Sequence, residues 1–328
     1  MKILVLGGAG YIGSHFVKKA IMDNHEVVVV DNLTTGHLQA VPKEAVFYNV
    51  DIRDEERLDR VFVYHHIDAC VHFAANSLVA ESMINPLMYF NNNVSGTIVL
   101  LRTMAKHNVK RIVFSSSAAV YGTHDKMPLV ESDETHPENP YGESKLMMEK
   151  IMAWTDRIHQ IRYASLRYFN VAGASFDASI GEDHRPETHL IPIILQVPLG
   201  KRDQLTIFGN DYPTPDGTCI RDYIHVEDLI DAHLLALDYV DKNDRSEIFN
   251  LGSENGYSNM DILDTARKIT GTEIPFKYGK RRPGDPPKLI ASSQKATLVL
   301  GWKRRHGIEE IIASAWAFHK THPDGYKE

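Results

Sequence analysis

Short runs of apolar, β-branched residues recur along the first half of the chain, separated by longer stretches with helical spacing. Runs of this length and composition are typical of buried strands. Six strands are predicted: Lys2–Leu6, Glu26–Asp31, Val46–Asp51, Ala69–Phe73, Arg111–Ser115 and Tyr163–Tyr168. Because helix-length segments separate them, we expect these strands to form one parallel sheet.

The stretches between the strands carry apolar residues at the spacing of amphipathic helices. Four helices are predicted: Tyr11–Asn24, Glu55–Tyr64, Met88–His107 and Tyr141–Ile158. Right-handed crossovers between parallel strands place such helices on both faces of a sheet. The pattern therefore predicts an α/β chain with a Rossmann-like, doubly wound parallel sheet.

The texture of the sequence changes near residue 172, where clusters of Gly, Pro and polar residues alternate with short helical patches. The clusters are Gly173–Pro186 and Gly209–Gly217, and the patches are Leu190–Leu199 and Met260–Thr270. We expect a first domain over residues 1–172 and a smaller, mixed α/β substrate lobe over residues 173–328. A segment of about 219–243, which includes a helical pattern at Val226–Tyr239, is expected to return to the first domain.

The composition excludes several classes of protein. With 43% hydrophobic and 24% charged residues among 328, the chain is typical of a soluble globular protein with two lobes. The net charge of −7 provides no basic field for nucleic acid or anionic lipid. No apolar stretch approaches the roughly 20 residues that cross a membrane, so a cytoplasmic location is expected. Cys70 and Cys219 lack metal-ligand spacing, and no metal site is predicted.

A glycine-rich turn follows the first predicted strand and opens the first predicted helix. Gly7, Gly10 and Gly13 satisfy the dinucleotide-binding spacing, with Tyr11 and Ile12 between the last two. Such glycines allow a tight turn and a close approach of a pyrophosphate to the helix N-terminus. A glycine turn without a ligand is the alternative, and the strand–turn–helix context favours the dinucleotide.

Two acidic residues end the second and third predicted strands. Asp31, followed by Asn32, stands where a carboxylate accepts hydrogen bonds from the adenosine ribose, which favours NAD over NADP because a 2′-phosphate would be repelled. Asp51, followed by Ile52, has two possible roles. It contacts the adenine edge, or it caps the helix that begins near Glu55.

Tyr141 and Lys145 form a Tyr-x-x-x-Lys pattern that places both side chains on one face of a helix. Alone this pattern is weak, because a solvated tyrosine beside a surface lysine gives it by chance. Here it lies downstream of the glycine turn and of Ser115 to Ser117. An ammonium and a positive nicotinamide would both favour a phenolate, which could accept a proton from a substrate hydroxyl. The constellation indicates carbonyl–alcohol redox chemistry.

The ordered motifs resemble the extended short-chain dehydrogenase/reductase family, and within it the UDP-glucose 4-epimerases. The resemblance covers nearly the whole chain: residues 7–15, 31–33, 51–53, 72–74, 91–94, 115–122, 141–145 and 166–170, then 207–212, 221–226, 250–252 and 281–285. It implies reversible, NAD-dependent epimerisation of UDP-glucose and UDP-galactose at C4. Hydride passes to bound NAD, the 4-keto sugar rotates, and hydride returns to the opposite face.

The resemblance also implies a role for each matched residue. Tyr141 would be the acid/base, Lys145 its activator, and Ser117 the hydroxyl that steadies the hexose. The implied cofactor set is Gly7, Gly10, Tyr11, Ile12, Gly13, Asp31, Asn32, Asp51, Ile52, Phe73, Ala74, Asn93, Ser115, Tyr141, Lys145 and Tyr168. The implied substrate set is Ser117, Tyr141, Asn170, His189, Leu190, Arg221, Arg282, Asp285 and Leu289. Surface salt bridging is the alternative for Arg221 and Arg282, and a turn-forming role for Asp285.

Two positions depart from the family pattern. His189 stands where the family often has asparagine, although imidazole also forms hydrogen bonds. Leu289 aligns with a position that gates the space around the sugar's 2-substituent, where leucine is smaller than tyrosine. We therefore expect some activity on UDP-N-acetylhexosamines. The family is commonly homodimeric, and the apolar stripes of Met88–His107 and Tyr141–Ile158 fit that role as well as they fit internal packing.

Three alternatives remain open at this stage. A nucleotide-sugar 4,6-dehydratase would need an acidic pair after the serine strand, where this chain has Ala118 and Ala119. A UDP-glucuronate epimerase would need a group for the C6 carboxylate, and the sequence offers no obvious one. A non-catalytic, NAD-sensing protein typically lacks the tyrosine or the lysine, whereas this chain retains both.

Overall fold

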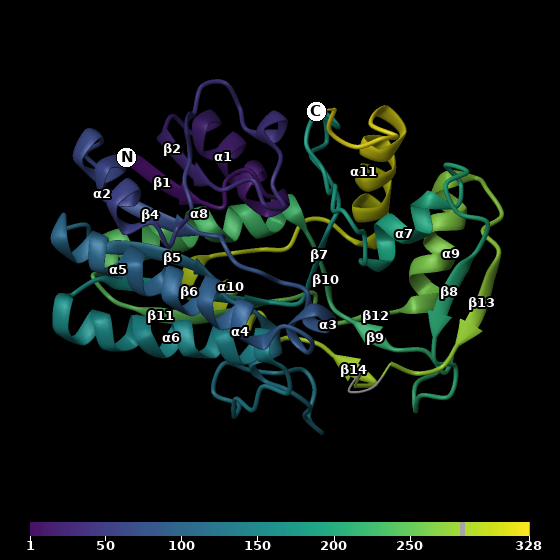
Figure 1. Ribbon diagram of the computed structural model, residues 1–328. Coiled ribbons are helices and arrows are strands. Elements are labelled where there is room, and N and C mark those ends of the chain that lie inside the picture. The colour runs from purple at the N-terminus through teal and green to yellow at the C-terminus, as the bar shows by residue number, and fades with distance from the viewer. Residues whose placement is uncertain (283–285, 328) are drawn as a thin grey trace.

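The computed structural model describes residues 1–282 and 286–327, and its larger lobe is built on one parallel sheet of seven strands (Figure 1). The strand order is β11-β6-β5-β4-β1-β2-β3, and every pairing is parallel. The strands are β1 (Lys2–Leu6), β2 (Glu26–Asp31), β3 (Val46–Asn49), β4 (Ala69–His72), β5 (Arg111–Ser115), β6 (Arg162–Tyr168) and β11 (Glu247–Leu251). The predicted doubly wound α/β fold is confirmed.

Alternate residues of each strand enter different cores, because successive side chains point to opposite faces of a sheet. In β1, Ile3 and Val5 join one core while Leu4 and Leu6 join the other, and all four are fully buried. The first core packs under α1 (Tyr11–Met22), α8 (Val226–Asn243) and α10 (Gln294–Leu300). The second packs under α2 (Glu55–Tyr64), α5 (Gly96–Lys106) and α6 (Pro140–His159). Helices therefore cover both faces, as predicted.

The seventh strand, β11, was not among the six strands predicted from the sequence. It pairs with β6 at the edge of the sheet, from Glu247 opposite Ala164 to Leu251 opposite Tyr168. The part of the later chain that packs on this sheet therefore starts and ends later than the predicted segment 219–243. It begins with α8 and includes β11 and later α10, whose Ala296 and Leu300 lie in the first core.

The predicted helix Met88–His107 is interrupted. It begins earlier, as α4 (Pro86–Tyr89), passes through a π-helical segment at Phe90–Ser95, and continues as α5. A hydrogen bond in a π-helix spans one residue more than in an α-helix, so the face of the helix shifts here. The short α3 (Val79–Ser82) precedes it. A 3₁₀ turn at Leu38–Ala40 and another at Ala118–Val120 complete this lobe.

The smaller lobe lies beside the carboxyl ends of the large sheet (Figure 1). Its strands form three small sheets: β7 (Asn170–Ala172) with β10 (Tyr223–His225), β12 (Tyr257–Ser258) with β9 (Ile220–Arg221) and β14 (Lys288–Leu289), and β8 (Leu205–Phe208) with β13 (Phe276–Gly279). Its helices are α7 (Leu190–Gln196), α9 (Asn259–Thr270) and α11 (Ile308–Thr321). Their apolar faces share a separate core. Among the described residues, no helix has the length and apolar character needed to span a bilayer.

Candidate functional site

The glycine turn after β1 is built so tightly that side chains would disturb it. Gly7 has φ of +80°, and a Cβ there would lie 2.6 Å from the backbone nitrogen of Ala74. A Cβ on Gly13 would collide with the carbonyl oxygen of Gly7. Gly10 is the N-cap of α1, and neither a side chain nor an acidic first turn neutralises that helix end. The turn therefore leaves room and partial positive charge for an anion, as the sequence predicts.

Asp31 lies at the end of β2, next to this turn, and is 9% exposed. Its carboxylate accepts hydrogen bonds from the backbone N–H groups of Ala9 at 3.0 Å and Leu33 at 2.8 Å. Burial raises the pKa of Asp31, and these two hydrogen bonds oppose the rise. Each carboxylate oxygen retains acceptor capacity, which suits the ribose hydroxyls of a dinucleotide.

Asp51 does not cap α2, so one of its two predicted roles is wrong. The N-cap is Asp54, whose side chain accepts a hydrogen bond from the N–H of Arg57. Asp51 instead binds the guanidinium of Arg53 at 2.7 and 2.8 Å and accepts a hydrogen bond from Asn32 at 3.0 Å. The hydrogen bond from Arg53 holds the pKa of Asp51 well below its usual range. Asn32 and Asp51, predicted separately, are thus joined at the strand ends.

Phe73 and Ala74, which follow β4, and Ile52, which follows β3, are three further predicted cofactor residues. The N–H groups of Phe73 and Ala74 both donate to the carbonyl oxygen of Leu6, which brings the end of β4 against the glycine turn. Ile52 is 5% exposed and packs on Gly96, where a Cβ would lie 2.6 Å from its side chain. The structure thus brings these predicted residues to one edge of the sheet.

Asn93 lies in the π-helical segment and is completely buried. Its amide nitrogen donates to Ser144 at 2.9 Å and to the carbonyl oxygen of Asn76 at 3.1 Å, and its oxygen accepts from the N–H of Asn76 at 2.8 Å. These contacts connect the loop after β4 to α6, so Asn93 helps to position the helix that carries Tyr141.

Lys145 and Ser115 join α6 to the end of β5. Lys145 is 3% exposed and its ammonium donates to the carbonyl oxygen of Ser115 at 2.7 Å. The Ser115 hydroxyl forms a short hydrogen bond with the hydroxyl of Tyr168 at the end of β6. Burial lowers the pKa of Lys145 to about 7, and the charge of Glu149 opposes this effect. Three predicted residues therefore meet at the carboxyl ends of two adjacent strands.

Tyr141 lies in the first turn of α6, partly buried, and shares a hydrogen bond with Ser117. Lys145 Nζ lies 5.9 Å from the centre of the Tyr141 ring. Burial raises the pKa of Tyr141, and the Ser117 hydrogen bond only partly offsets this. Further positive charge beside the ring, such as that of a nicotinamide, would favour the phenolate.

A buried ion pair beneath this cluster was missed by the sequence analysis. Arg167 binds both carboxylate oxygens of Glu149 at 2.6 and 2.9 Å, and both residues are 4% exposed. Ser116 donates to the same carboxylate at 2.5 Å. Tyr121 accepts from Arg167 at 3.0 Å. The network fixes α6 to β5 and β6. The sequence signal that could have revealed it is the presence of two charged residues, Glu149 and Arg167, on helix and strand faces that are otherwise apolar.

Three of the predicted substrate residues, Asn170, Arg221 and Leu289, lie in strands of the smaller lobe. Arg221 and Leu289 are register partners in β9 and β14 and therefore lie side by side. Asn170 begins β7, and its N–H donates to the carbonyl oxygen of Asp222 at 3.2 Å. The guanidinium of Arg282 stacks over the Phe208 ring, 4.3 Å from its centre. Asp285 lies outside the described residues.

His189 and Leu190 lie at the start of α7, where His189 is the N-cap and Leu190 packs against the smaller core. His189 Nδ1 lies 2.7 Å from the carboxylate of Glu182 and 3.1 Å from that of Glu187. Burial lowers the pKa of His189, but Glu182 and Glu187 outweigh burial and raise it to about 10. The carboxylates of Glu182 and Glu187 thus hold His189 through its charge. An asparagine at this position, as in the family pattern, carries no charge and could not form such ion pairs.

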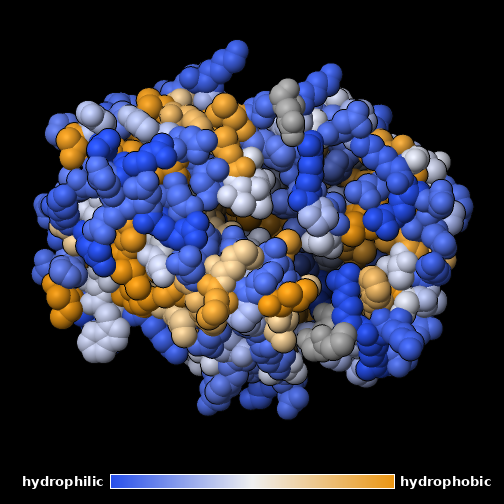
Figure 2. All heavy atoms as spheres, in the orientation of Figure 1, coloured by the Kyte–Doolittle hydropathy of each residue, from blue (hydrophilic) through white to orange (hydrophobic). Residues whose placement is uncertain are grey.

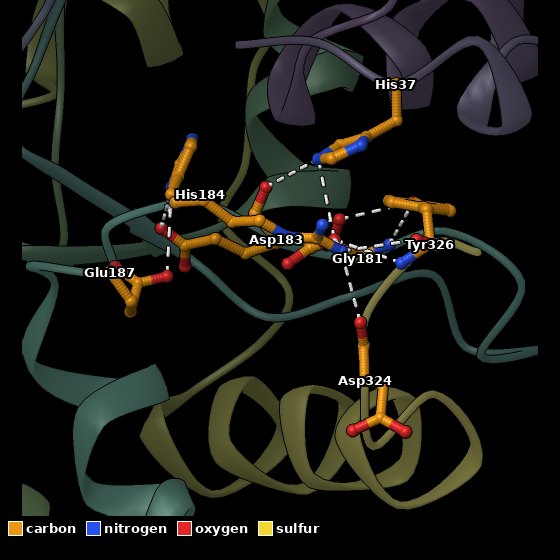
Figure 3. Close-up of polar contacts among 9 residues, drawn as sticks. His37, Gly181, Asp183, His184, Glu187, Asp324 and Tyr326 are labelled. Carbon is orange, nitrogen blue, oxygen red and sulfur yellow. Dashed lines mark hydrogen bonds and ion pairs between the residues drawn. The ribbon is translucent and has the colours of Figure 1, made fainter. Parts of the chain in front are cut away.

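Two contacts fasten the lobes next to the glycine turn. The hydroxyl of Tyr11 donates to the carbonyl oxygen of Gly173 at 2.7 Å. His37 lies 2.9 Å from the carbonyl oxygen of Asp183, and the Asp183 carboxylate accepts from the N–H of Tyr326 at 2.9 Å (Figure 3). Tyr326 also packs its ring against His37. The two lobes and the C-terminal residues therefore meet at one point.

Comparison with known proteins agrees with this geometry. Residues 3–252 match the model of the NAD dependent epimerase/dehydratase family. The chain is 55% identical to UDP-glucose 4-epimerase of Lactobacillus helveticus, over 100% of both chains. It superposes on a crystal structure of a UDP-glucose 4-epimerase with a TM-score of 0.98, at 51% identity and over 100% of both chains. A Bifidobacterium longum UDP-glucose 4-epimerase, solved in complex with NAD⁺ and UDP, is 38% identical with a TM-score of 0.95, over 99% of this chain and 100% of that one.

Proposed function

The chain belongs to the NAD dependent epimerase/dehydratase family, and from this premise we propose that it interconverts UDP-glucose and UDP-galactose by inverting C4 of the hexose. One observation carries the proposal. Tyr141, Lys145 and Ser117 converge at the carboxyl ends of β5 and β6, beside a turn built for a dinucleotide. Ligands of open α/β sheets bind at this edge.

The residues around the glycine turn fit NAD. Gly7 and Gly13 close the turn so tightly that no side chain fits, and Asp31 presents a buried carboxylate beside it. Gly10 leaves the N-terminus of α1 open to a pyrophosphate. When bound there, NAD supplies a hydride acceptor and, for the return step, a hydride donor.

Tyr141 would exchange the proton. As a phenolate, its oxygen would take the proton from the sugar's 4-hydroxyl while hydride leaves the same carbon for the nicotinamide, and the phenol so formed would give the proton back when the carbon is reduced. Ser117, hydrogen-bonded to Tyr141, is placed to hold the same sugar oxygen. Lys145 lies against the Tyr141 ring, and its charge favours the phenolate once the site holds a second positive group.

The smaller lobe would hold UDP, with Arg221 and Arg282 near the diphosphate and Asn170, His189 and Leu190 near the rest of the nucleotide. Asp285 would bind the uridine ribose. Such a site must bind UDP firmly and the hexose weakly, because strong contacts to one hexose orientation would oppose its rotation.

The test is to incubate the purified protein with UDP-galactose, without added cofactor, and to separate the products. UDP-glucose is expected, and the Tyr141→Phe protein serves as the inactive control. A product that has lost water would indicate a 4,6-dehydratase, and bound NAD without turnover would indicate a sensor. The dehydratase is disfavoured because Ala118 and Ala119 supply no acid to the 3₁₀ turn after β5.

We also propose that the site accepts UDP-N-acetylhexosamines. Leu289 lies beside Arg221, which places it near the predicted diphosphate site, and leucine leaves more space than tyrosine. Parent protein should epimerise UDP-N-acetylglucosamine, while Leu289→Tyr should lose that activity and retain turnover of UDP-galactose. Failure of the parent on both N-acetylated epimers would remove this part of the proposal.

We propose further that the protein is a homodimer through α4, α5 and α6. Figure 2 shows hydrophobic side chains grouped over this part of the surface. Large apolar residues here are well exposed: Leu87 79%, Ile84 78%, Ile158 69% and Trp154 63%. A monomer rarely exposes so much apolar surface in one region. Analytical ultracentrifugation should give twice the chain mass, and Trp154→Glu with Leu87→Glu should give monomers.

Finally, we propose that the protein works in the cytoplasm. Both cysteines, Cys70 and Cys219, are buried as thiols, which fits a reducing compartment. Fractionation of the source cells should recover the epimerase activity with cytoplasmic markers, and recovery from the culture medium would argue against this location.

A further inference from the structure

Four potential metal ligands gather in the loop that leads from β7 to α7. Glu182, His184, Glu187 and His189 each offer one ligand atom, and these four atoms all lie within 4.8 Å of one another. We call these four residues the 182–189 cluster. Figure 3 shows His184 and Glu187 turned toward one another beside the contact between the lobes. Sequence reasoning missed the cluster because it searched for cysteine-containing ligand patterns.

We propose that the 182–189 cluster is a binding site for a divalent transition-metal ion of the zinc class.

The distances between the ligand atoms suit a four-coordinate ion. Glu182 Oε1 lies 2.7 Å from His189 Nδ1 and 3.1 Å from His184 Nδ1. Glu187 lies 3.1 Å from His189 Nδ1 and 3.8 Å from His184 Nδ1. Zinc bonds of about 2.0–2.2 Å in a tetrahedron hold neighbouring ligand atoms roughly 3.4 Å apart. These four separations differ from that spacing by about 0.7 Å or less, and all the ligand atoms lie within 4.8 Å of one another, so modest side-chain shifts would make room for the ion.

The donor atoms select the class of metal. Two imidazole nitrogens and two carboxylate oxygens are typical zinc ligands, whereas Mg²⁺ and Ca²⁺ prefer sites made of oxygen alone. The short spacing Glu-x-His-x-x-Glu-x-His supplies all four ligands from one segment of chain. Such a local site needs only the loop to be held in place.

Charge balance also favours a divalent ion. The Glu182 side chain is 5% exposed and that of Glu187 is 9% exposed, so two carboxylates are held close together away from water. A divalent ion bound by two neutral imidazoles would neutralise both carboxylates.

The cluster is accessible from solvent, and it lies where a bound ion would stabilise the contact between the lobes. The His189 side chain is 45% exposed and that of His184 is 27% exposed, so the cluster is open on the histidine side. His184 packs edge-on against Tyr11, which contacts the smaller lobe through Gly173. Bound metal would brace the loop at the joint between the lobes, apart from the Tyr141 hydroxyl chemistry.

The test uses tag-free, full-length protein that has been treated with EDTA and dialysed. Elemental analysis after incubation with Zn²⁺ and removal of excess should find one zinc per chain. Titration with Co²⁺ should give the strong visible absorption of a four-coordinate ion, which hydrated Co²⁺ lacks. His184→Gln and Glu187→Gln should each weaken binding about tenfold or more. His66→Gln changes an exposed histidine outside the cluster and should bind like the parent.

Absence of stoichiometric zinc in the parent, a six-coordinate Co²⁺ spectrum, or equal binding by both cluster variants would each overturn the proposal. Thermal unfolding in EDTA checks that the variants fold, and if neither does, the parent's Co²⁺ spectrum decides. Epimerase activity measured in EDTA is independent of these readouts, so failure of the metal site and failure of the proposed reaction are distinguishable.

Discussion

At the scale of single residues, Tyr141 is the group on which the proposed chemistry depends. Removing its hydroxyl removes the proton acceptor but leaves the UDP-binding residues of the smaller lobe in place. Tyr141→Phe should lower kcat for UDP-galactose by about 10²–10⁴-fold, the usual contribution of a positioned acid/base. UDP affinity, measured by calorimetry, should stay close to that of the parent.

The matched control is Tyr64→Phe, which removes a hydroxyl from a tyrosine that is 71% exposed on α2. It should leave kcat unchanged. Parent-like turnover by Tyr141→Phe would show that another group exchanges the proton.

The chemical residues could be predicted because their spacing is local. Tyr141 and Lys145 are four residues apart on one helix, while Ser115 ends one strand and Ser117 follows it. Of the two roles offered for Asp51, the helix cap is wrong because its carboxylate binds Arg53 two residues further on, and the adenine-edge contact stays a prediction. The buried pair of Glu149 and Arg167 joins a helix to a strand, so the packing of α6 on the sheet decides it.

At the scale of elements, two glycines of the glycine turn serve different purposes: Gly13 is needed for folding, and Gly10 for cofactor binding. A Cβ on Gly13 would collide with the backbone of the turn, whereas a Cβ on Gly10 would lie 3.4 Å from the carbonyl oxygen of Gly7, an ordinary contact. Gly13→Ala should therefore lower both thermal stability and NAD content. Gly10→Ala should fold like the parent in the absence of NAD.

Gly10→Ala should nevertheless bind NAD more weakly, because its new methyl group projects at the N-terminus of α1 where a pyrophosphate would approach. Thermal unfolding with and without NAD measures both effects, together with the NAD released from heat-denatured protein. Equal NAD affinity in Gly10→Ala and the parent would place the pyrophosphate elsewhere.

Two elements could not be read from the pattern. β11 is a five-residue run, EIFNL, whose place at the sheet edge is set by its pairing with β6. The π-helical segment, FNNNVS, includes three consecutive asparagines, and the side chain of Asn93 is bonded to residues far along the chain. In both cases the element is determined by contacts with distant parts of the chain, and the local pattern of apolar residues carries no information about those contacts.

At the scale of the whole molecule, buried histidines should make stability depend on pH. Burial lowers the pKa of His15 and His233 to about 4 and of His72 and His225 to about 3. The unfolded chain binds more protons than the folded chain between these values and about 6.5, so stability should fall as pH falls through that window. Each histidine contributes up to about 1.4 kcal/mol per pH unit.

Thermal unfolding of the NAD-free protein between pH 7.5 and 4.5 measures this effect. The four buried histidines should leave the unfolding temperature unchanged above pH 6.5 and should lower it as the pH falls below that value. His233→Gln should decline less steeply than the parent, because His233 titrates only on unfolding. His66→Gln, which alters an exposed histidine, should follow the parent. An equal slope in all three would assign the acid sensitivity to other groups.

The fastening of the lobes through Tyr11, His37, Asp183 and Tyr326 has a consequence for the coenzyme. It lies next to the glycine turn, so we expect a dinucleotide bound at that turn to leave more slowly while the joint stays closed. NAD would then be a resident prosthetic group, carried through many turnovers, and its residence time would be set by the last few residues of the chain. Tyr326→Ala should shorten that residence time, as followed by exchange with labelled NAD.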